Sequence, residues 1–358
     1  MEIGYTDTLF LLRFNTSFVF VTLNYRYVCS HQVTQLSPVA LYVVSHPLHV
    51  MVISVLGIIM NVFVLLVFWL HKKACTVPEI YLCNLAAADL LLTAFLSFWA
   101  KIIANQYKWQ FSDHLCKVFH AAIVMNAFSS IYFLVMISID RYLALVHPLS
   151  HQSLRRPRTA KLVCFVVWSL ALVFTCPTII YREVEHYHQT SICVLNIPHS
   201  LLYSGIMIIF TFIIPTGFIL YFTVKILKAL RNRLSTKMNS NSQAQEQKAT
   251  TLVLSVLLAF LICWVPYHVV NIITMLVKLY KVEGCRFVIN LSICINMFTY
   301  LAFFNSVLNP ILYVIVGKKF QKKAKELFTL RCDNKYPVSF SLISQCQSRS
   351  DTTRVTPD

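Results

Sequence analysis

The sequence predicts an all-α membrane protein, a seven-transmembrane helix bundle with an amphipathic eighth helix. Of its 358 residues, 57% are hydrophobic and only 13% are charged, whereas a soluble globular chain carries about 25% charged residues. The apolar residues form seven runs, each near or above the ~20 residues that a helix needs to cross a bilayer. Lysines and arginines lie between these runs, alternately dense and sparse, which is the positive-inside pattern and not a nucleic-acid-binding surface.

Residues 1–45 are expected to form an extracellular N-terminal tail. The stretch 9–28 is apolar and aromatic, but Arg13, Asn15 and Arg26 interrupt it. An additional span or a poor signal sequence therefore remain as less favoured alternatives. Asn15 begins an Asn-Thr-Ser triplet, which is an acceptor pattern for N-glycosylation.

The seven helices are expected to form a transmembrane domain over residues 46–316. The density of basic residues places the N-terminus outside, and an odd number of spans then places the C-terminus inside. We therefore expect a multi-pass protein of the plasma membrane. The expected helical runs are 46–70, 79–104, 114–146, 160–181, 200–229, 247–279 and 286–316.

The third run carries chemically distinctive residues at both ends. Cys116 precedes Asp140 by 24 positions, which corresponds to roughly 36 Å of helix at ~1.5 Å per residue. One helix thus places a cysteine at one membrane surface and the acid–base pair Asp140 and Arg141 at the other.

Residues 317–332 are expected to form an amphipathic interfacial helix, followed by a disordered cytoplasmic tail at 333–358. Phe320, Ala324 and Leu327 fall on one face, with lysines elsewhere, as in helices that lie on an anionic inner leaflet of membrane lipids. Cys332 is a candidate for palmitoylation, although an unmodified cysteine remains the alternative. Hydroxyl residues in the tail are candidate phosphorylation sites.

Each span also contains a polar, aromatic or proline motif. The complete set, in this order, resembles the rhodopsin-like G-protein-coupled receptors over residues 46–332, and so implies a receptor and not an enzyme. The motifs are Gly57 to Asn61, Asn84 to Asp89, Asp140-Arg141-Tyr142, Trp168, Pro215, Cys263-Trp264-Val265-Pro266 and Asn309-Pro310-Ile311-Leu312-Tyr313.

Asp89 is an acid near the middle of the membrane, where an ionisable side chain is costly and therefore a functional candidate. The resemblance implies that it binds a structural sodium ion, the only cofactor expected. A protonated, hydrogen-bonded Asp89 is the alternative. The other residues implied for this site are Asn126, Ser130, Asn305, Ser306 and Asn309.

Arg141 can pair with Asp140 beside it and with Glu246 at the start of the sixth span. A pair between two helices can hold them together in one state and release them in another. The resemblance implies that this state is inactive and that the freed arginine helps to form the G-protein cleft. An arginine that only extends to the interface is the alternative. The implied switch residues are Asp140, Arg141, Tyr142, Glu246, Asn309, Pro310 and Tyr313.

Two disulfides are implied by the resemblance. Cys116 with Cys193 would tie the third span to the second outer loop, and Cys29 with Cys285 would tie the tail to the seventh span. Disulfides are expected outside the cell because that compartment is oxidising. The twelve cysteines include no cluster with metal-ligand spacing.

Longer stretches resemble the bradykinin (kinin) receptors, with the angiotensin receptors next. They include 75–90, 138–146 and 309–320. This resemblance implies a peptide agonist and signalling through Gq-class proteins to phospholipase C and calcium, with arrestin and receptor kinases acting on the tail. The sixth span is similar to the first kinin subtype and the third span to the second.

Positions expected to meet the peptide depart from the kinin pattern, as does Ser97, which replaces a proline in the second span. Val124 replaces a lysine found in the first subtype, and Thr274 and Ser292 replace acids that meet the basic N-terminus of the peptide. Loop acids, namely Glu283, Glu183 or Glu185, are candidate substitutes. Arg182 matches the pattern and can meet a peptide carboxylate. The expected pocket comprises Trp99, His120, Val124, Arg182, Trp264, Tyr267, His268, Asn271 and Tyr300.

Other functions remain to be weighed against a kinin receptor. Within the same fold, the chain can be an orphan or constitutively active receptor that has lost kinin binding, or a receptor for an angiotensin-like or other peptide. A transporter or channel would need paired repeats, broken helices or rings of charge, which the sequence lacks. An enzyme would need a nucleophile, a base and an orienting group in one site, and no such set is evident.

Overall fold

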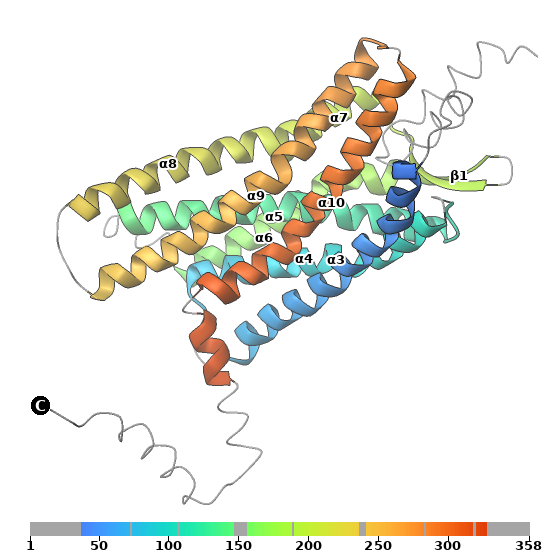
Figure 1. The fold of residues 1–358 in the computed structure, drawn as a ribbon. Helices are drawn as coiled ribbons and strands as arrows, with labels where there is room; N and C mark the ends of the chain where they lie inside the picture. The colour runs from blue at the N-terminus through green and yellow to red at the C-terminus, as the bar shows by residue number, and fades with distance from the viewer. Residues whose placement is uncertain are drawn as a thin grey trace, which may run out of the picture.

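The computed structural model describes residues 37–71, 74–105, 108–146, 156–187, 190–235, 241–282, 284–317 and 320–327. Seven of the described helices are long and apolar enough to cross a membrane, which confirms the predicted bundle (Figure 1). The spans are α3 (Ser37–Leu70), α4 (Val77–Ala104), α5 (Asp113–Val146), α6 (Pro157–Tyr181), the continuous pair α7 (Ser200–Ile208) and α8 (Ile214–Ser235), α9 (Asn241–Leu279) and α10 (Cys285–Val316).

Helix boundaries follow local sequence signals. At the start of α4, the backbone N–H of Thr76 donates to the Glu79 carboxylate at 2.8 Å, in a capping box. Pro157 begins α6, where its missing N–H removes no helical hydrogen bond. Helix α3 begins at Ser37, inside the segment expected to be tail, because residues 37–45 continue the apolar run.

Helix α5 lies at the centre of the bundle and is the most buried of the seven described spans. Its apolar window is 61% buried, against 22% for the span formed by α7 and α8. A buried apolar cluster includes Ile131 and Leu134 of α5 together with Phe260 of α9 and Tyr313 of α10. It lies in the half of the bundle where α5 ends, which is called the inner half, and the half where α5 begins is called the outer half, after the orientation that the basic residues predict. The bundle therefore packs around α5, while α7 and α8 face outward over most of their length.

The fifth span is interrupted by a π-helical turn at Ile209–Ile213 between α7 and α8. Pro215 follows within two residues and has no N–H to donate to the turn before it. The Tyr132 hydroxyl of α5 donates to the Phe210 carbonyl at 3.1 Å. The sequence predicts a kink at Pro215, and the structure accommodates the lost bond by widening the helix one turn earlier.

Two antiparallel strands, β1 (Arg182–Tyr187) and β2 (Thr190–Leu195), follow α6 and project from the end of the bundle where α5 begins (Figure 1). A disulfide joins Cys193 of β2 to Cys116 of α5. The Val184 N–H also donates to the Asp113 carboxylate at 3.1 Å, and the Trp109 N–H donates to the Ser191 carbonyl at 2.7 Å. The hairpin is thus fixed to the start of α5 by one covalent bond and one hydrogen bond, and to the segment just before α5 by another hydrogen bond.

A short helix over 320–327 leaves the inner end of α10 at an angle (Figure 1). Phe320 is buried and packs edge-to-face against Phe68 with ring centroids 5.6 Å apart. Lys323 pairs with Glu79 at 3.0 Å, and both side chains are largely enclosed. The predicted amphipathic eighth helix is confirmed over these residues, with its apolar face on the bundle.

Candidate functional site

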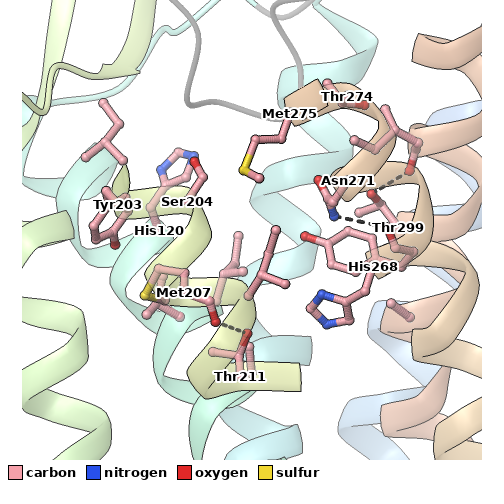
Figure 2. Close-up of a pocket in the computed structure, with 18 of the residues that line it drawn as sticks. His120, Tyr203, Ser204, Met207, Thr211, His268, Asn271, Thr274, Met275 and Thr299 are labelled. Atoms are coloured by element: carbon pink, nitrogen blue, oxygen red, sulfur yellow. Dashed lines mark hydrogen bonds between the residues drawn. The ribbon is translucent and has the colours of Figure 1, made fainter. Parts of the chain in front are cut away.

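A cavity of about 260 Å³ opens in the outer half of the bundle. It lies between α5, the end of α6, α7, α9 and α10, below the strand pair. Figure 2 shows Tyr203 and Met207 on one side of it and Asn271 and Thr274 on the other. Eight of the nine residues expected to form the pocket line this cavity: Trp99, His120, Val124, Arg182, Trp264, Tyr267, His268 and Asn271.

Tyr300 is the exception, because it does not line the cavity. Its neighbour Thr299 does, and adjacent residues of an α-helix point about 100° apart. Tyr300 instead packs against the apolar cluster that contains Leu92, Leu96 and Phe303. The predicted contact of Tyr300 with a ligand therefore stays a prediction that the lining of this cavity does not support.

The sequence reasoning missed the wall formed by the fifth span. Tyr203, Met207 and Thr211 line the cavity from α7 and the π-helical turn (Figure 2). They are four residues apart and therefore lie on one helical face. The sequence signal that could have identified this wall was the four-residue spacing, with a polar residue at each end, in a largely apolar run.

Aromatic rings connect the cavity floor to the inner core. His268 stacks on Phe212 with ring centroids 4.2 Å apart and on Trp264 at 5.8 Å. Trp264 in turn stacks on the buried Phe260 at 6.0 Å. His268 is only 5% exposed, and its Nδ1 has no hydrogen-bond partner among the described residues. The stacked rings of His268, Trp264 and Phe260 all belong to α9, which contains Pro266.

The charged residues in the described lining are both basic. Arg182 reaches the cavity from the start of β1 and Lys278 from the last turn of α9, whereas no aspartate or glutamate among the described residues lines it. Burial lowers the pKa of Arg182 to about 9, so its guanidinium remains protonated at neutral pH. Glu183 and Glu185, expected as possible substitutes for the missing acids, lie on β1 outside the lining.

His120 lies beside the disulfide at the outer end of α5. Its Nδ1 is 2.9 Å from the Cys116 carbonyl and 3.4 Å from the Cys193 sulfur. One histidine and two cysteines so placed have the geometry of metal ligands. Both sulfurs are bonded to each other, however, so this group is a covalent tether.

Asp89 lies at the centre of a buried polar cluster in the middle of the bundle. Its carboxylate accepts hydrogen bonds from the Ser306 hydroxyl at 2.8 Å and the Asn309 amide at 2.8 Å. The Asn126 amide at 3.2 Å and the Ser130 hydroxyl at 3.4 Å complete the set. Four of the five residues expected around Asp89 therefore contact it, from α5 and α10.

Asn305, the fifth residue, makes no hydrogen bond to Asp89. Its Oδ1 is buried without a partner among the described residues, as is the Oδ1 of Asn309. The Asp89 carboxylate, the Ser130 and Ser306 hydroxyls and the unpartnered amide oxygen of Asn309 form an oxygen-rich donor set, which suits a hard cation such as sodium. The residues present therefore fit the ion that the sequence led us to expect.

At the inner end of α5, the Arg141 guanidinium donates to the Asp140 carboxylate from Nη2 at 2.5 Å and from Nε at 3.1 Å. Tyr142 packs against Phe222 of α8 at 5.3 Å between centroids. Tyr313 is 1% exposed, and its hydroxyl lacks a hydrogen-bond partner in the described part of the chain. The expected Arg141–Glu246 pair cannot be placed, since Glu246 lies in α9 but its side chain is outside the described set.

Several other expected residues lie outside the described structure. Asn15, Cys29 and Cys332 fall in undescribed segments, as does Glu283. Cys285 begins α10, but its side chain is not among those described. The second disulfide, the glycosylation site and the palmitoylation site therefore stay predictions.

Comparison with known proteins agrees with this arrangement. Residues 60–313 match a family model described as "7 transmembrane receptor (rhodopsin family)". The B2 bradykinin receptor of Sus scrofa is 41% identical over 289 residues, which cover 78% of each chain. The B2 bradykinin receptor of Homo sapiens is 40% identical over 78% of this chain and 73% of its own length.

The B1 bradykinin receptor of Macaca mulatta is 36% identical over 287 residues, covering 79% of this chain and 82% of its own. All three alignments are long enough to include most of the transmembrane domain. Identity to these B2 receptors exceeds identity to this B1 receptor, so the two subtypes that the sequence motifs left unresolved are not equally similar overall.

Proposed function

We propose, from the premise that this chain belongs to the rhodopsin family of seven-transmembrane receptors, that it is a peptide-activated receptor of the kinin type. Its signal would pass through Gq-class G proteins to phospholipase C and calcium. The observation that carries this proposal is the roughly 40% identity to B2 bradykinin receptors over 78% of this chain. The cavity lies at one end of the bundle and Arg141 at the other, as signalling across a membrane requires.

The proposed mechanism is a shift in the population of two conformations. A peptide in the cavity contacts Trp264 and His268, which form part of the aromatic column on α9. Movement of that column changes the packing of Phe260 in the inner core and favours the state in which α9 opens. Arg141 then leaves Asp140 and takes part in the G-protein cleft.

A sodium ion at Asp89 belongs to the same proposal. When bound, it would supply positive charge that balances the buried carboxylate. Ser130 and Ser306 would turn their hydroxyl oxygens toward it, and Asn309, which is hydrogen-bonded to Asp89, holds an unpartnered amide oxygen. These residues join α5 to α10, so the ion would stabilise one arrangement of the two helices.

The proposed orientation has the N-terminus outside and the C-terminus inside the cell. The short helix over 320–327 then lies at the inner leaflet, where lysines favour anionic lipids. Receptor kinases and arrestin would act on the tail beyond it, which contains Ser348, Ser350, Thr352 and Thr353.

Calcium release in transfected cells tests the receptor assignment. Intact and des-Arg kinins should each be applied to cells in which surface expression has been measured. A concentration-dependent response that is lost in Arg141→Ala, while labelled peptide still binds, is the expected result. Silence toward both peptides at normal surface expression would remove the kinin assignment.

An orphan or constitutively active receptor, or one for an angiotensin-like peptide, is the second candidate. One observation favours it: Thr274 and Ser292, where kinin receptors are expected to carry acids, both line the cavity without charge. High basal inositol phosphate production without peptide would identify a constitutive receptor. A response to an angiotensin-like peptide alone would identify the other form.

A further inference from the structure

The π-helical turn of the fifth span leaves one backbone carbonyl without a helical donor. In an α-helix, the Phe210 carbonyl would accept a hydrogen bond from the N–H of Ile214, four residues later. Here that N–H donates to the Ile209 carbonyl instead. A π-helical bond would need the N–H five residues after Phe210, but this residue is Pro215, which has none. Neither helical pattern therefore provides a donor for the Phe210 carbonyl.

Tyr132 of α5 supplies the missing donor. Its hydroxyl donates to the Phe210 carbonyl at 3.1 Å. The Tyr132 ring stacks on Phe128 with centroids 4.6 Å apart, and Phe128 stacks on Phe174 of α6 at 4.4 Å. Phe174 in turn lies against the Phe210 ring at 5.1 Å between centroids. Aromatic packing from two helices thus holds this hydroxyl against the turn.

The hydrogen bond from Tyr132 favours the π-helical register over a regular α-helix. A regular helix would pair the Phe210 carbonyl with the N–H of Ile214. It would instead leave the Thr211 carbonyl without a donor, because Pro215 is four residues later. The Tyr132 hydroxyl therefore satisfies the carbonyl that the π-helical register leaves open. This span lies in the membrane, where water does not replace a missing hydrogen bond, so the preference is not cancelled by solvent.

The register of the turn determines which side chains form the cavity wall (Figure 2). Helix α7 has no buried side chain in the described structure, whereas Ile219 and Ile226 of α8 are fully buried. A change of register would therefore rotate α7 and leave α8 in place. The π-helical turn contains one more residue than an α-helical turn, so its loss corresponds to a rotation of about 100°. Met207 would leave the cavity, and Ile209, which is now exposed outside the lining, would enter it.

We propose that Tyr132 is a positioning residue for the ligand cavity, because its hydroxyl holds the fifth span in the register that places Met207 and Thr211 in the wall. Tyr132 does not line the cavity itself and acts through the Phe210 carbonyl. The inference rests on the proposed function in taking this cavity as the ligand site. It adds the residue that sets the position of one wall.

Labelling of an introduced cysteine tests this inference without an agonist. Receptor carrying Ile209→Cys is treated in membranes with a negatively charged methanethiosulfonate reagent. Mass spectrometry then measures modification at residue 209 alone, because the chain has twelve cysteines of its own. The reagent does not react with a thiol that faces lipid, so the labelling rate at 209 reports how often this residue lines the water-filled cavity.

Tyr132→Phe removes the hydroxyl and keeps the stacked ring. A hydrogen bond of ordinary net strength changes the ratio of two states by about two- to tenfold. We therefore expect Tyr132→Phe to raise the labelling rate at 209 by about that factor. Tyr221→Phe is the matched control substitution, because Tyr221 is an exposed tyrosine of the same span outside the lining. It should leave the rate unchanged.

A second reporter separates a change of register from general loosening of the helix. Ile206 is exposed and outside the lining, and a rotation of about 100° in the same direction would not bring it into the cavity. Ile206→Cys should therefore label at the same rate with and without Tyr132→Phe. An equal rise at 206 and 209 would overturn the inference.

Pro215→Ala tests the cause of the preference. Alanine restores an N–H that can donate to the Phe210 carbonyl, so Tyr132→Phe should produce no further rise at 209 in that background. A rise of the same size with proline and with alanine overturns the inference. If Pro215→Ala does not reach the surface, the comparison of the 206 and 209 reporters decides alone.

The outcomes also separate this inference from the proposed function. An unchanged labelling rate at 209 in Tyr132→Phe overturns the role of Tyr132, whether or not kinins activate the receptor. A receptor that is silent toward kinins but shows the expected labelling pattern would overturn the kinin assignment and support the role of Tyr132.

Discussion

Gly57 leaves no room for a side chain where α3 faces α4. A Cβ placed on it would lie 2.8 Å from the Cβ of Thr93, which is closer than such atoms approach in proteins. The Ser54 hydroxyl donates to the Thr93 carbonyl at 2.7 Å beside it. This small residue therefore sets how closely the two helices pack.

Gly57→Ala is expected to destabilise the receptor by about 1–3 kcal/mol, because it overpacks this contact. The thermal midpoint of purified receptor in detergent, followed by a thiol-reactive or intrinsic fluorescence signal, would fall by several degrees. Gly217→Ala is the control, since nothing lies within 4 Å of a Cβ there. Equal midpoints for Gly57→Ala and Gly217→Ala would show that the contact is not tight.

Asp89 offers a second residue-scale prediction. Sodium chloride should raise the thermal midpoint of the receptor more than choline chloride at equal ionic strength, because sodium balances the buried carboxylate. Asp89→Asn should abolish the difference between the two salts. Equal stabilisation of the unaltered receptor by both salts would argue against a sodium site.

Single residues could be predicted where the side chain itself is unusual for its surroundings. Asp89 and its neighbour Asn126 are polar in apolar helices, so they had to find partners inside the bundle. Tyr300 could not be placed because an aromatic side chain suits both a cavity wall and a packed core. The direction in which it points depends on the rotation of α10, which a motif does not specify.

The short helix over 320–327 is joined to the first two spans by more than apolar contact. Lys323 pairs with Glu79, which also caps the start of α4, and Glu326 pairs with His71 at 2.9 Å. Lys323 also lies 5.8 Å from the ring centroid of Phe68. One carboxylate thus connects this helix to the N-terminus of α4.

A double-mutant cycle should reveal that connection. Lys323→Gln and Glu79→Gln are each expected to lower the thermal midpoint, and the double variant should lose less than their sum, with a coupling free energy of about 0.5–3 kcal/mol. Lys322→Gln is the control because the Lys322 side chain is 76% exposed and its own ion pair, with Glu326 at 3.9 Å, stays within the short helix. Additive effects of the two single changes would contradict a direct pair.

Helices and strands could be predicted from the sequence where their residue pattern was strong. Long apolar runs with prolines and basic flanks predicted all seven spans, because the bilayer imposes length and composition. The strand pair 182–195 was not predicted, since short strands in a loop depend on a partner and on the disulfide that holds them. The π-helical turn was also missed, because Pro215 predicts a lost hydrogen bond but not how the helix absorbs it.

At the scale of the whole molecule, the seven spans in the described part of the chain predict that its two ends lie on opposite sides of the membrane. An epitope tag at the N-terminus should bind antibody on intact cells, whereas a tag at the C-terminus should bind only after permeabilisation. Untagged cells and a tagged cytosolic protein are the controls. Detection of both tags on intact cells would require an even number of crossings and contradict the bundle.

The bond between Cys116 and Cys193 also has a consequence for biosynthesis. Cys193 emerges 77 residues after Cys116, and α5 and α6 lie between them. The chain must cross the bilayer and return before the two thiols share one side, so the bond closes only after both helices have been inserted. An oxidising enzyme of the secretory pathway would therefore act on two spans that are already in the membrane. The disulfide that it forms would show that both α5 and α6 had been inserted.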